Sequence, residues 1–223
     1  MGAFLGISLW IALATVVPGL ITIATLYGAF VFINLQLFKN NLSLIQANDW
    51  VWAGGAITIM VLTQAVGILL ERFLVNKKKL GNETTTTTIP KGIDPFGKTE
   101  VTINPYNEYN GLYILLAELK ENEDTQGHLK RAIAQFFLTN NSLVSFSVGI
   151  VAALLITLIS VISNISYGVI IRGSLYVIAL GACLIVSYKV AVIRFMVMSK
   201  SLWATRRVRI SNKSSVSASN KKS

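Results

Sequence analysis

Two long stretches without a charged side chain constrain this protein more than any other feature of its sequence. Residues 1–38 and 132–171 contain no Asp, Glu, Lys or Arg. Soluble domains have roughly 25% charged residues, whereas only 13% of this chain is charged. Apolar runs of this length are typical of segments that are solvated by lipid. The sequence therefore predicts an integral membrane protein.

The apolar stretches are long enough for four transmembrane helices. A helix of about 20 residues crosses the hydrocarbon core of a bilayer, which is roughly 30 Å thick. We predict an all-α membrane protein whose four transmembrane helices form two hairpins, with spans at residues 4–34, 50–70, 142–163 and 173–195 and polar loops at 39–49 and 164–172. Its parts are a first hairpin (1–70), a polar segment (71–141), a second hairpin (142–198) and a basic, Ser-rich tail (199–223). The tail is expected to be disordered or to lie on the bilayer surface.

The polar segment between the second and third spans is predicted to be small, helical and in part β. Residues 84–89 and 98–103 are rich in Thr, Val and Ile, and Gly and Pro lie between them. This pattern predicts either a small hairpin or an extended linker. Apolar residues at helical spacing predict a helix over residues 106–120. A further helix is expected to start near Thr125 and to continue without a break into the third span.

The distribution of Lys and Arg predicts the orientation of the chain. Nine of these residues lie between Arg72 and Arg131 and nine between Lys189 and Lys222, whereas Lys39 and Arg172 stand alone in the two short loops. Cytoplasmic loops carry the excess of basic residues in membrane proteins. Both termini and the polar segment are therefore predicted to be cytoplasmic, in a plasma membrane or a bacterial inner membrane.

Basic side chains near the ends of the spans are predicted to contact lipid. The net charge of +10 comes mainly from the tail, because the polar segment has nine basic and nine acidic residues. A basic tail beside a membrane indicates anionic lipid as its partner, at about 1 kcal/mol per basic residue, and no nucleic acid is predicted. The residues expected to contact headgroups are Lys77, Lys78, Lys79, Lys189, Arg194, Arg206, Arg207 and Arg209.

Two residues within the spans are singled out by their chemistry. Pro18 lacks a backbone donor and is predicted to kink the first span. Thr15 or Thr22 is expected to satisfy the carbonyl that Pro18 frees. Gln64 is the most polar residue deep in a span, and we predict that it makes an interhelical hydrogen bond, with pore lining as the alternative.

The sequence carries no recognisable catalytic, cofactor or metal motif. It lacks a P-loop, a nucleophile elbow, a zinc-binding His-Glu-x-x-His and a dinucleotide fingerprint. It contains one His (His128) and one Cys (Cys183), and the spacing of its acidic cluster, residues 118–124, does not match a calcium loop. No catalytic residue, cofactor or metal is therefore predicted.

Topology and charge favour a non-enzymatic membrane protein. The leading hypothesis is a module in which the cytoplasmic segment binds an unidentified partner or ligand and is coupled to, or anchored by, the four spans. The alternative is an oligomeric channel, because four mostly apolar spans offer little polar lining within one subunit. A membrane-embedded enzyme or lipid-handling protein is less favoured.

Overall fold

The computed structural model describes the backbone of residues 2–45, 49–88, 100–112, 124–163 and 167–219. Side chains are described for residues 13–34, 53–86, 88, 100–112, 129–163 and 167–207.

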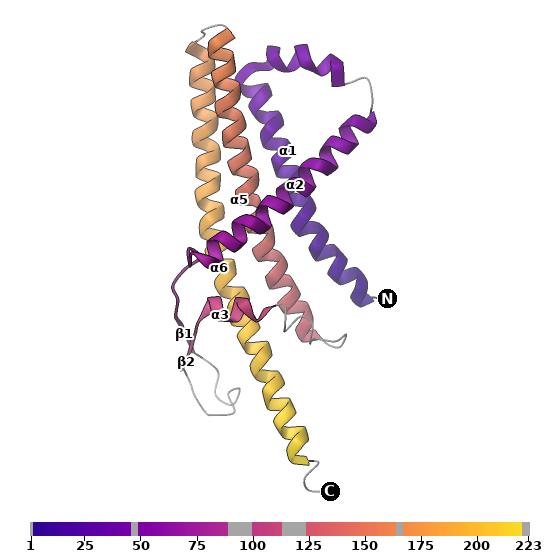
Figure 1. The fold of residues 1–223 in the computed structure, drawn as a ribbon, viewed down its shortest axis with the longest axis vertical. Helices are drawn as coiled ribbons and strands as arrows, with labels where there is room; N and C mark the ends of the chain where they lie inside the picture. Colours follow the sequence, from indigo (N-terminus) through magenta and orange to yellow (C-terminus); the bar gives the residue numbers. More distant parts are fainter. Residues whose placement is uncertain (1, 46–48, 89–99, 113–123, 164–166, 220–223) are drawn as a thin grey trace.

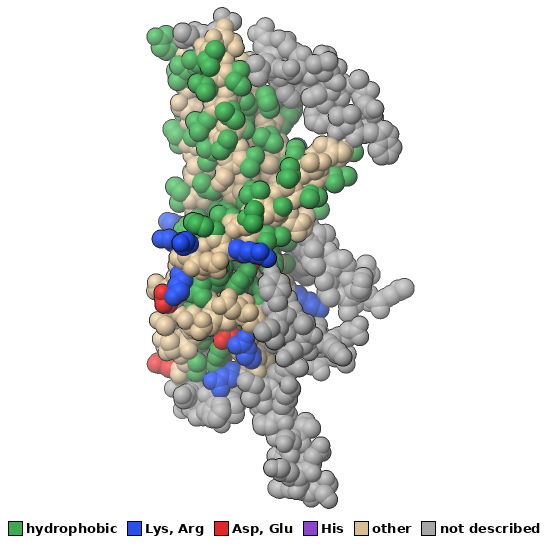
Figure 2. Space-filling view, viewed as in Figure 1, with side chains coloured by type: hydrophobic (Ala, Val, Ile, Leu, Met, Phe, Trp, Pro, Cys, Tyr) green, Lys and Arg blue, Asp and Glu red, His purple; other side chains and the backbone are tan. Residues whose placement is uncertain are grey.

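Four long helices dominate the structure (Figure 1): α1 (Gly2–Ile45), α2 (Asp49–Asn76), α5 (Asp124–Ser163) and α6 (Tyr167–Ser219). Each contains a stretch that is long and apolar enough to cross a membrane, at Leu13–Asn34, Ala53–Asn76, Leu129–Ser163 and Tyr167–Arg207. Large apolar side chains such as Leu69 and Ile178 point outward on these stretches, and Figure 2 shows them covering the upper part of the molecule. The prediction of a mostly helical protein with four candidate spans is confirmed.

Helix α5 is the centre of the helical assembly, with α1 packed parallel to it and α6 packed antiparallel. Asn141 of α5 contacts Ala14 of α1, and Ser160 contacts Asn34, so the numbering rises together along both helices. Along α6 the order is reversed, because Gln135 contacts Arg194 and Gly149 lies beside Leu180. The second predicted hairpin thus has an antiparallel geometry.

Helix α2 crosses α1 obliquely rather than running alongside it (Figure 1). At the crossing, a Cβ atom added to Gly19 of α1 would lie 2.9 Å from the Cα of Met60. The backbones of the two helices therefore approach closely at a single point. The hairpin expected for α1 and α2 stays a prediction, and the two helices cross obliquely at Gly19.

The contact between α1 and α5 extends over about the thickness of a bilayer core. Twenty residues separate Ala14 from Asn34, a rise of about 30 Å in a helix. At Asn34 the backbone departs from helical geometry (φ −149°, ψ 84°), and its side chain donates to Ser160 Oγ over 2.8 Å.

Two sequence-based loop boundaries, beside α1 and α6, need correction, whereas the kink expected at Pro18 stays a prediction. The departure from helical geometry in α1 lies at Asn34, and Pro18 stands inside the helix. The helix then continues to Ile45, so residues 39–45 do not form the predicted loop. Helix α6 starts at Tyr167, so residues 167–172 are helical rather than part of the predicted loop, and residues 164–166 lie outside the described part of the chain.

The prediction of a disordered tail is wrong as far as Ser219, because α6 continues to that residue. Helix nucleation is costly, whereas propagation is not, and α6 is already fixed by packing as far as Leu202, which is fully buried. The residues that follow contain no Gly or Pro. No helix-breaking residue therefore stops α6 at the start of the basic tail.

Helix α2 ends in a Schellman motif, which turns the chain toward α6. The Lys79 N–H donates to the Leu74 carbonyl over 2.8 Å and the Lys78 N–H donates to the Val75 carbonyl over 3.0 Å. Lys78 occupies the C′ position with φ 51°, a left-handed conformation that usually requires Gly.

This geometry predicts that Lys78→Gly stabilises the protein. A left-handed residue with a Cβ costs about 1 kcal/mol or more, so Gly at position 78 should be about 1 kcal/mol more stable than Ala there. Comparing Gly with Ala isolates the backbone, because both variants lose the exposed Lys78–Glu83 ion pair (2.9 Å). Equal unfolding midpoints of the two variants in detergent would contradict the left-handed conformation of this residue.

After α2 the chain forms a small hairpin and a short helix. Strands β1 (Thr85–Thr88) and β2 (Glu100–Ile103) pair antiparallel, with Thr85 opposite Ile103. The hairpin alternative is thus confirmed over the linker. Helix α3 (Pro105–Asn110) begins at Asn104, whose side chain accepts hydrogen bonds from the Tyr106 and Asn107 N–H groups.

The two helices predicted in the polar segment have different outcomes. The helix predicted over residues 106–120 is interrupted at Gly111, and residues 113–123 lie outside the described part of the chain. The prediction of an unbroken helix from near Thr125 into the third span is confirmed by α5.

Candidate functional site

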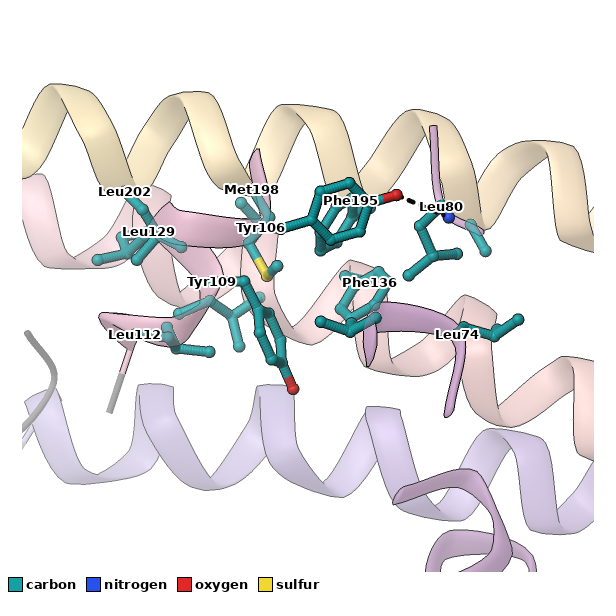
Figure 3. Close-up of a cluster of buried hydrophobic side chains, with 14 of the residues drawn as sticks. Leu74, Leu80, Tyr106, Tyr109, Leu112, Leu129, Phe136, Phe195, Met198 and Leu202 are labelled. Carbon is teal, nitrogen blue, oxygen red and sulfur yellow. Dashed lines mark hydrogen bonds between the residues drawn. The ribbon is translucent and has the colours of Figure 1, made fainter. Parts of the chain in front are cut away.

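The turn after α2, the α3 region and the lower parts of three long helices enclose a common apolar core. We call this assembly the polar unit: residues 71–88 and 100–112, with residues 129–136 of α5 and 191–206 of α6. Its buried side chains come from all of these segments, as Figure 3 shows, and include Leu74, Leu80, Tyr106, Tyr109, Leu112, Leu129, Phe136, Phe195, Met198 and Leu202. The polar unit is therefore built directly on the helices that continue into the spans.

Phe195 of α6 joins the segments of this core. Its ring centroid lies 5.2 Å from that of Tyr106, 6.0 Å from that of Tyr109 and 5.5 Å from that of Phe136. Tyr106 and Tyr109 belong to α3, and Phe136 belongs to α5. The tilted rings are the favoured arrangement for aromatic pairs, which add about 0.5–1.5 kcal/mol to the burial of their area.

Hydrogen bonds fix α3 against the end of α2 and against α6. The Tyr106 hydroxyl accepts from the Leu80 N–H (3.1 Å) and donates to the Gly81 carbonyl (3.0 Å), as Figure 3 shows for the first bond. The Ser199 hydroxyl donates to the Pro105 carbonyl over 3.2 Å. Polar groups at the start of α3 are thus paired inside the unit.

Glu71 is an acidic residue enclosed by this assembly, with 2% of its surface exposed. Its carboxylate accepts a hydrogen bond from the Tyr109 hydroxyl, which points away from the apolar cluster (Figure 3). A buried carboxylate is costly unless it is hydrogen-bonded. Tyr109 therefore satisfies the most expensive polar group at the end of α2.

Tyr109→Phe tests this pairing while preserving the ring. Because the variant leaves the buried carboxylate without its hydroxyl donor, the free energy of unfolding should fall by about 1–3 kcal/mol. In a Glu71→Gln background the same substitution should cost less, since the uncharged amide is less expensive to leave unpaired. Unfolding in mixed micelles measures both differences, and equal costs in the two backgrounds would contradict the pairing.

Arg206 connects the tail helix to α3. Its Nη1 lies 3.1 Å from Oε2 of Glu108. Burial raises the pKa of the Glu108 carboxyl above its ordinary value, and the positive charges of Arg206 and Arg207 oppose that rise. The basic tail thus contacts the polar segment through α3.

Asn140 and Asn141 of α5, the asparagine pair, tie α5 to α1 and α2. The Asn141 Nδ2 group donates to the Ala14 carbonyl of α1 over 3.0 Å. The Asn140 Nδ2 group donates to the Gly67 carbonyl of α2 over 2.8 Å. Both asparagines are buried, Asn140 completely. Two consecutive residues therefore link three helices.

Pro18 explains why Asn141 is needed. Ala14 is four residues before Pro18, and its carbonyl has no helical donor because proline lacks an N–H. The expectation that Thr15 or Thr22 fills this role is corrected, since Asn141 donates to that carbonyl. The Thr22 hydroxyl instead donates to the Pro18 carbonyl (3.0 Å), which also accepts from Ser145 of α5 (2.7 Å).

A double-mutant cycle tests the link between Asn141 and Pro18. Asn141→Ala should lower the free energy of unfolding by about 0.6–2 kcal/mol, the range of hydrogen bonds between membrane helices. In a Pro18→Ala background the loss should be smaller, because the restored N–H at position 18 can donate to Ala14. The volume lost at position 141 is common to both backgrounds and cancels. Identical losses, measured by unfolding in bicelles, would count against this role of Asn141.

The basic residues predicted to meet lipid headgroups fall into two groups. Lys77, Lys79 and Lys189 are exposed. The others with described side chains have partners: Lys78 pairs with Glu83, Arg194 donates to Gln135 over 2.9 Å, Arg206 pairs with Glu108, and the Arg207 guanidinium lies 5.5 Å from the centre of the Trp203 ring. The side chain of Arg209 lies outside the described residues.

Gln64 is half-buried on α2, and its interhelical bond stays a prediction. The neighbouring Thr63 makes such a contact, since its hydroxyl lies 3.1 Å from that of Thr22 on α1. Among the described residues no group of three or more His, Cys, Asp or Glu side chains is placed to hold a metal ion.

Sequence reasoning missed the asparagine pair and the Glu71–Tyr109 bond. One signal for the pair was available, because Asn140 and Asn141 are adjacent amides inside the uncharged run of residues 132–171. A proline inside a span also requires a donor from elsewhere. Neither signal says which helix supplies that donor, since this depends on how the helices pack.

Comparison with protein-family models, with curated proteins and with solved structures finds no match for this chain. What the site does therefore follows from its own contacts. They form a junction in which one helix, α5, carries both the core of the polar unit and the bonds that hold α1 and α2.

Proposed function

We propose that this protein is a non-enzymatic, multi-pass membrane module. Its polar unit binds a partner or ligand, and α5 couples that event to the spans. The supporting observation is the spacing along α5. Phe136, in the core of the polar unit, is one helical turn from Asn140, which bonds to α2.

The coupling follows from the stiffness of a continuous helix. Helix α5 runs from Asp124 to Ser163, so the core of the polar unit and the asparagine pair lie on one rod. A tilt or rotation at Phe136 displaces the asparagine pair and strains its bonds to Ala14 and Gly67. Displacements at one site reach another through packed, rigid elements that contact both sites, rather than through a soft linker.

The orientation that goes with this function places the polar unit and both termini in the cytoplasm. The membrane is a plasma membrane or a bacterial inner membrane. The excess of Lys and Arg on the polar-unit side supports this orientation through the positive-inside rule. In Figure 2 the basic side chains lie at and below the lower boundary of the apolar surface.

Hydrogen exchange in proteoliposomes tests the coupling. A panel of synthetic antibody fragments selected against the hairpin and α3 serves as a surrogate partner. On binding, amide exchange in residues 14–25 of α1 should change several-fold. An Asn140→Ala/Asn141→Ala variant should bind the same fragments with a much smaller change in α1. Unchanged exchange in α1 and α2 of the wild-type protein, with every bound fragment, would contradict the proposal.

A second candidate function is an oligomeric channel, and the surface of α2 favours it. Gly54 and Gly55 are exposed, and a Cβ added to either would meet nothing within 4 Å. The nearby Thr58 hydroxyl is exposed and donates to the Gly54 carbonyl over 2.8 Å. A second copy packed on this small-residue surface would place Thr58 at an interface. The conductance of liposomes with reconstituted protein tests for a channel. Liposomes that remain impermeable to ions at high protein loading would exclude it.

A further inference from the structure

We propose that the junction between the end of α2 and α6 binds the phosphate headgroup of an anionic phospholipid through Lys79 and Lys189, with Lys77 beside them. This site is independent of the coupling proposed above. Sequence alone assigns headgroup contact to eight basic residues without distinguishing among them. The structure distinguishes those basic residues whose side chains it describes by the partners that they contact.

The basic side chains near the ends of the spans differ in whether they have a partner within the chain. Lys78, Arg194 and Arg206 have polar partners within the chain, and Arg207 lies against Trp203. Among the side chains that the structure describes, Lys77, Lys79 and Lys189 are exposed and make no ion pair. Unpaired ammonium groups are strong point charges that bind phosphate.

The end of α2 is held against α6 by direct contacts. The Tyr188 hydroxyl of α6 donates to the Lys79 carbonyl, just past the end of α2. The next contact follows one turn along α6, because a Cβ on Gly81 would lie 3.7 Å from the Val192 side chain. These contacts hold the backbone of Lys79 against the turn of α6 that carries Lys189. The Schellman motif sets the direction in which the chain leaves α2.

The junction between α2 and α6 lies at the lower edge of the apolar surface. Residues 173–188 of α6 are uncharged, so Lys189 is the first charge at the lower end of that run. Tyr188 is 39% exposed, and aromatic residues with a polar tip are typical of the membrane–water interface. Figure 2 shows basic side chains where the apolar surface ends. This is the depth at which a phospholipid presents its phosphate.

The charge and the depth of the exposed lysines identify the ligand by its chemistry. Two or three exposed ammonium groups favour a negatively charged group, and their position beside the apolar surface favours one attached to acyl chains. A zwitterionic headgroup places a compensating positive charge at the same site and should bind less tightly.

The test measures bound lipid on the full chain. Native mass spectrometry of the protein from micelles of phosphatidylcholine with phosphatidylglycerol counts retained lipids and gives their affinity. Lys79→Gln/Lys189→Gln should weaken the tightest phosphatidylglycerol by about 30-fold, at about 1 kcal/mol per lysine. Lys200→Gln/Lys213→Gln removes the same charge elsewhere and should leave that affinity within about threefold.

Two further variants and a displacement experiment distinguish this site from general charge effects. Lys79→Arg/Lys189→Arg retains both charges and should retain the lipid. Tyr188→Phe keeps all charges but removes the bond to Lys79, and should weaken phosphatidylglycerol without affecting phosphatidylcholine. Equal effects of the two glutamine variants would overturn the site. Displacement of phosphatidylglycerol by millimolar inorganic phosphate would show a site for free anions instead, and would also overturn it.

Discussion

Phe195→Ala is expected to lower the free energy of unfolding by about 3–5 kcal/mol. Phe195 is fully buried, and its ring meets those of Tyr106, Tyr109 and Phe136. Its removal opens a cavity between α3, α5 and α6 that the surrounding helices cannot close without losing other contacts. The change is measured by reversible unfolding in mixed micelles, and proteolysis should become faster in the segment that holds α3.

The matched control for this prediction is Phe73→Ala. Phe73 lies on α2 with 56% of its surface exposed, so its truncation opens no internal cavity and should cost less than about 1 kcal/mol. If both alanine variants lose the same stability, Phe195 does not lie in a packed core, and the polar unit is not built as described.

Gly67→Ala is expected to lower the free energy of unfolding by about 3 kcal/mol, the sum of overpacking and of weakened interhelical bonds. A Cβ at this position would lie 1.9 Å from Asn141 Oδ1 and 2.8 Å from its Cγ. The Gly67 carbonyl also accepts the bond from Asn140. The methyl group therefore pushes α2 away from both asparagines at once.

Two comparisons make this result specific. Gly181→Ala should be neutral or slightly stabilising, because a Cβ at that position meets nothing within 4 Å and Ala favours helix over Gly. In an Asn141→Ala background Gly67→Ala should cost much less, because the side chain that it strikes is absent. An undiminished cost in that background would show that the clash lies elsewhere.

The sequence predicts well those features that depend on local pattern. The candidate spans, the β-prone character of the residues that form β1 and β2 and the unbroken helix into the third span all follow from periodicity and composition. Each of these is decided by the residues within one segment. No contact between distant segments is needed to find them.

Features that depend on packing between segments could not be predicted in this way. The tail was expected to be disordered or to lie on the bilayer surface, but α6 continues to Ser219 because its preceding turns are fixed against the polar unit. The donor to Ala14 was sought near Pro18 in sequence, yet it comes from Asn141 on another helix. The oblique path of α2 likewise depends on where Gly19 and Gly67 allow close approach.

The charges show the same division. Sequence places basic residues near the ends of the spans and predicts that they meet lipid. Only tertiary contacts show that Arg194 donates to Gln135 and that Arg206 pairs with Glu108. A general preference for anionic lipid thereby becomes a proposal about two lysines.

The central claim is that α5 acts as one rigid rod from the polar unit through the spans. Pulsed electron paramagnetic resonance in liposomes tests it directly, with spin labels at Arg131→Cys and Leu155→Cys in a Cys183→Ala background. Both labelled positions are exposed, and 24 residues separate them, which in a continuous helix is about 36 Å. A narrow distribution centred near this distance is the predicted result. A broad distribution at clearly shorter distances would reveal a break in α5 between the two labelled positions, and would contradict the rigid rod on which the coupling depends.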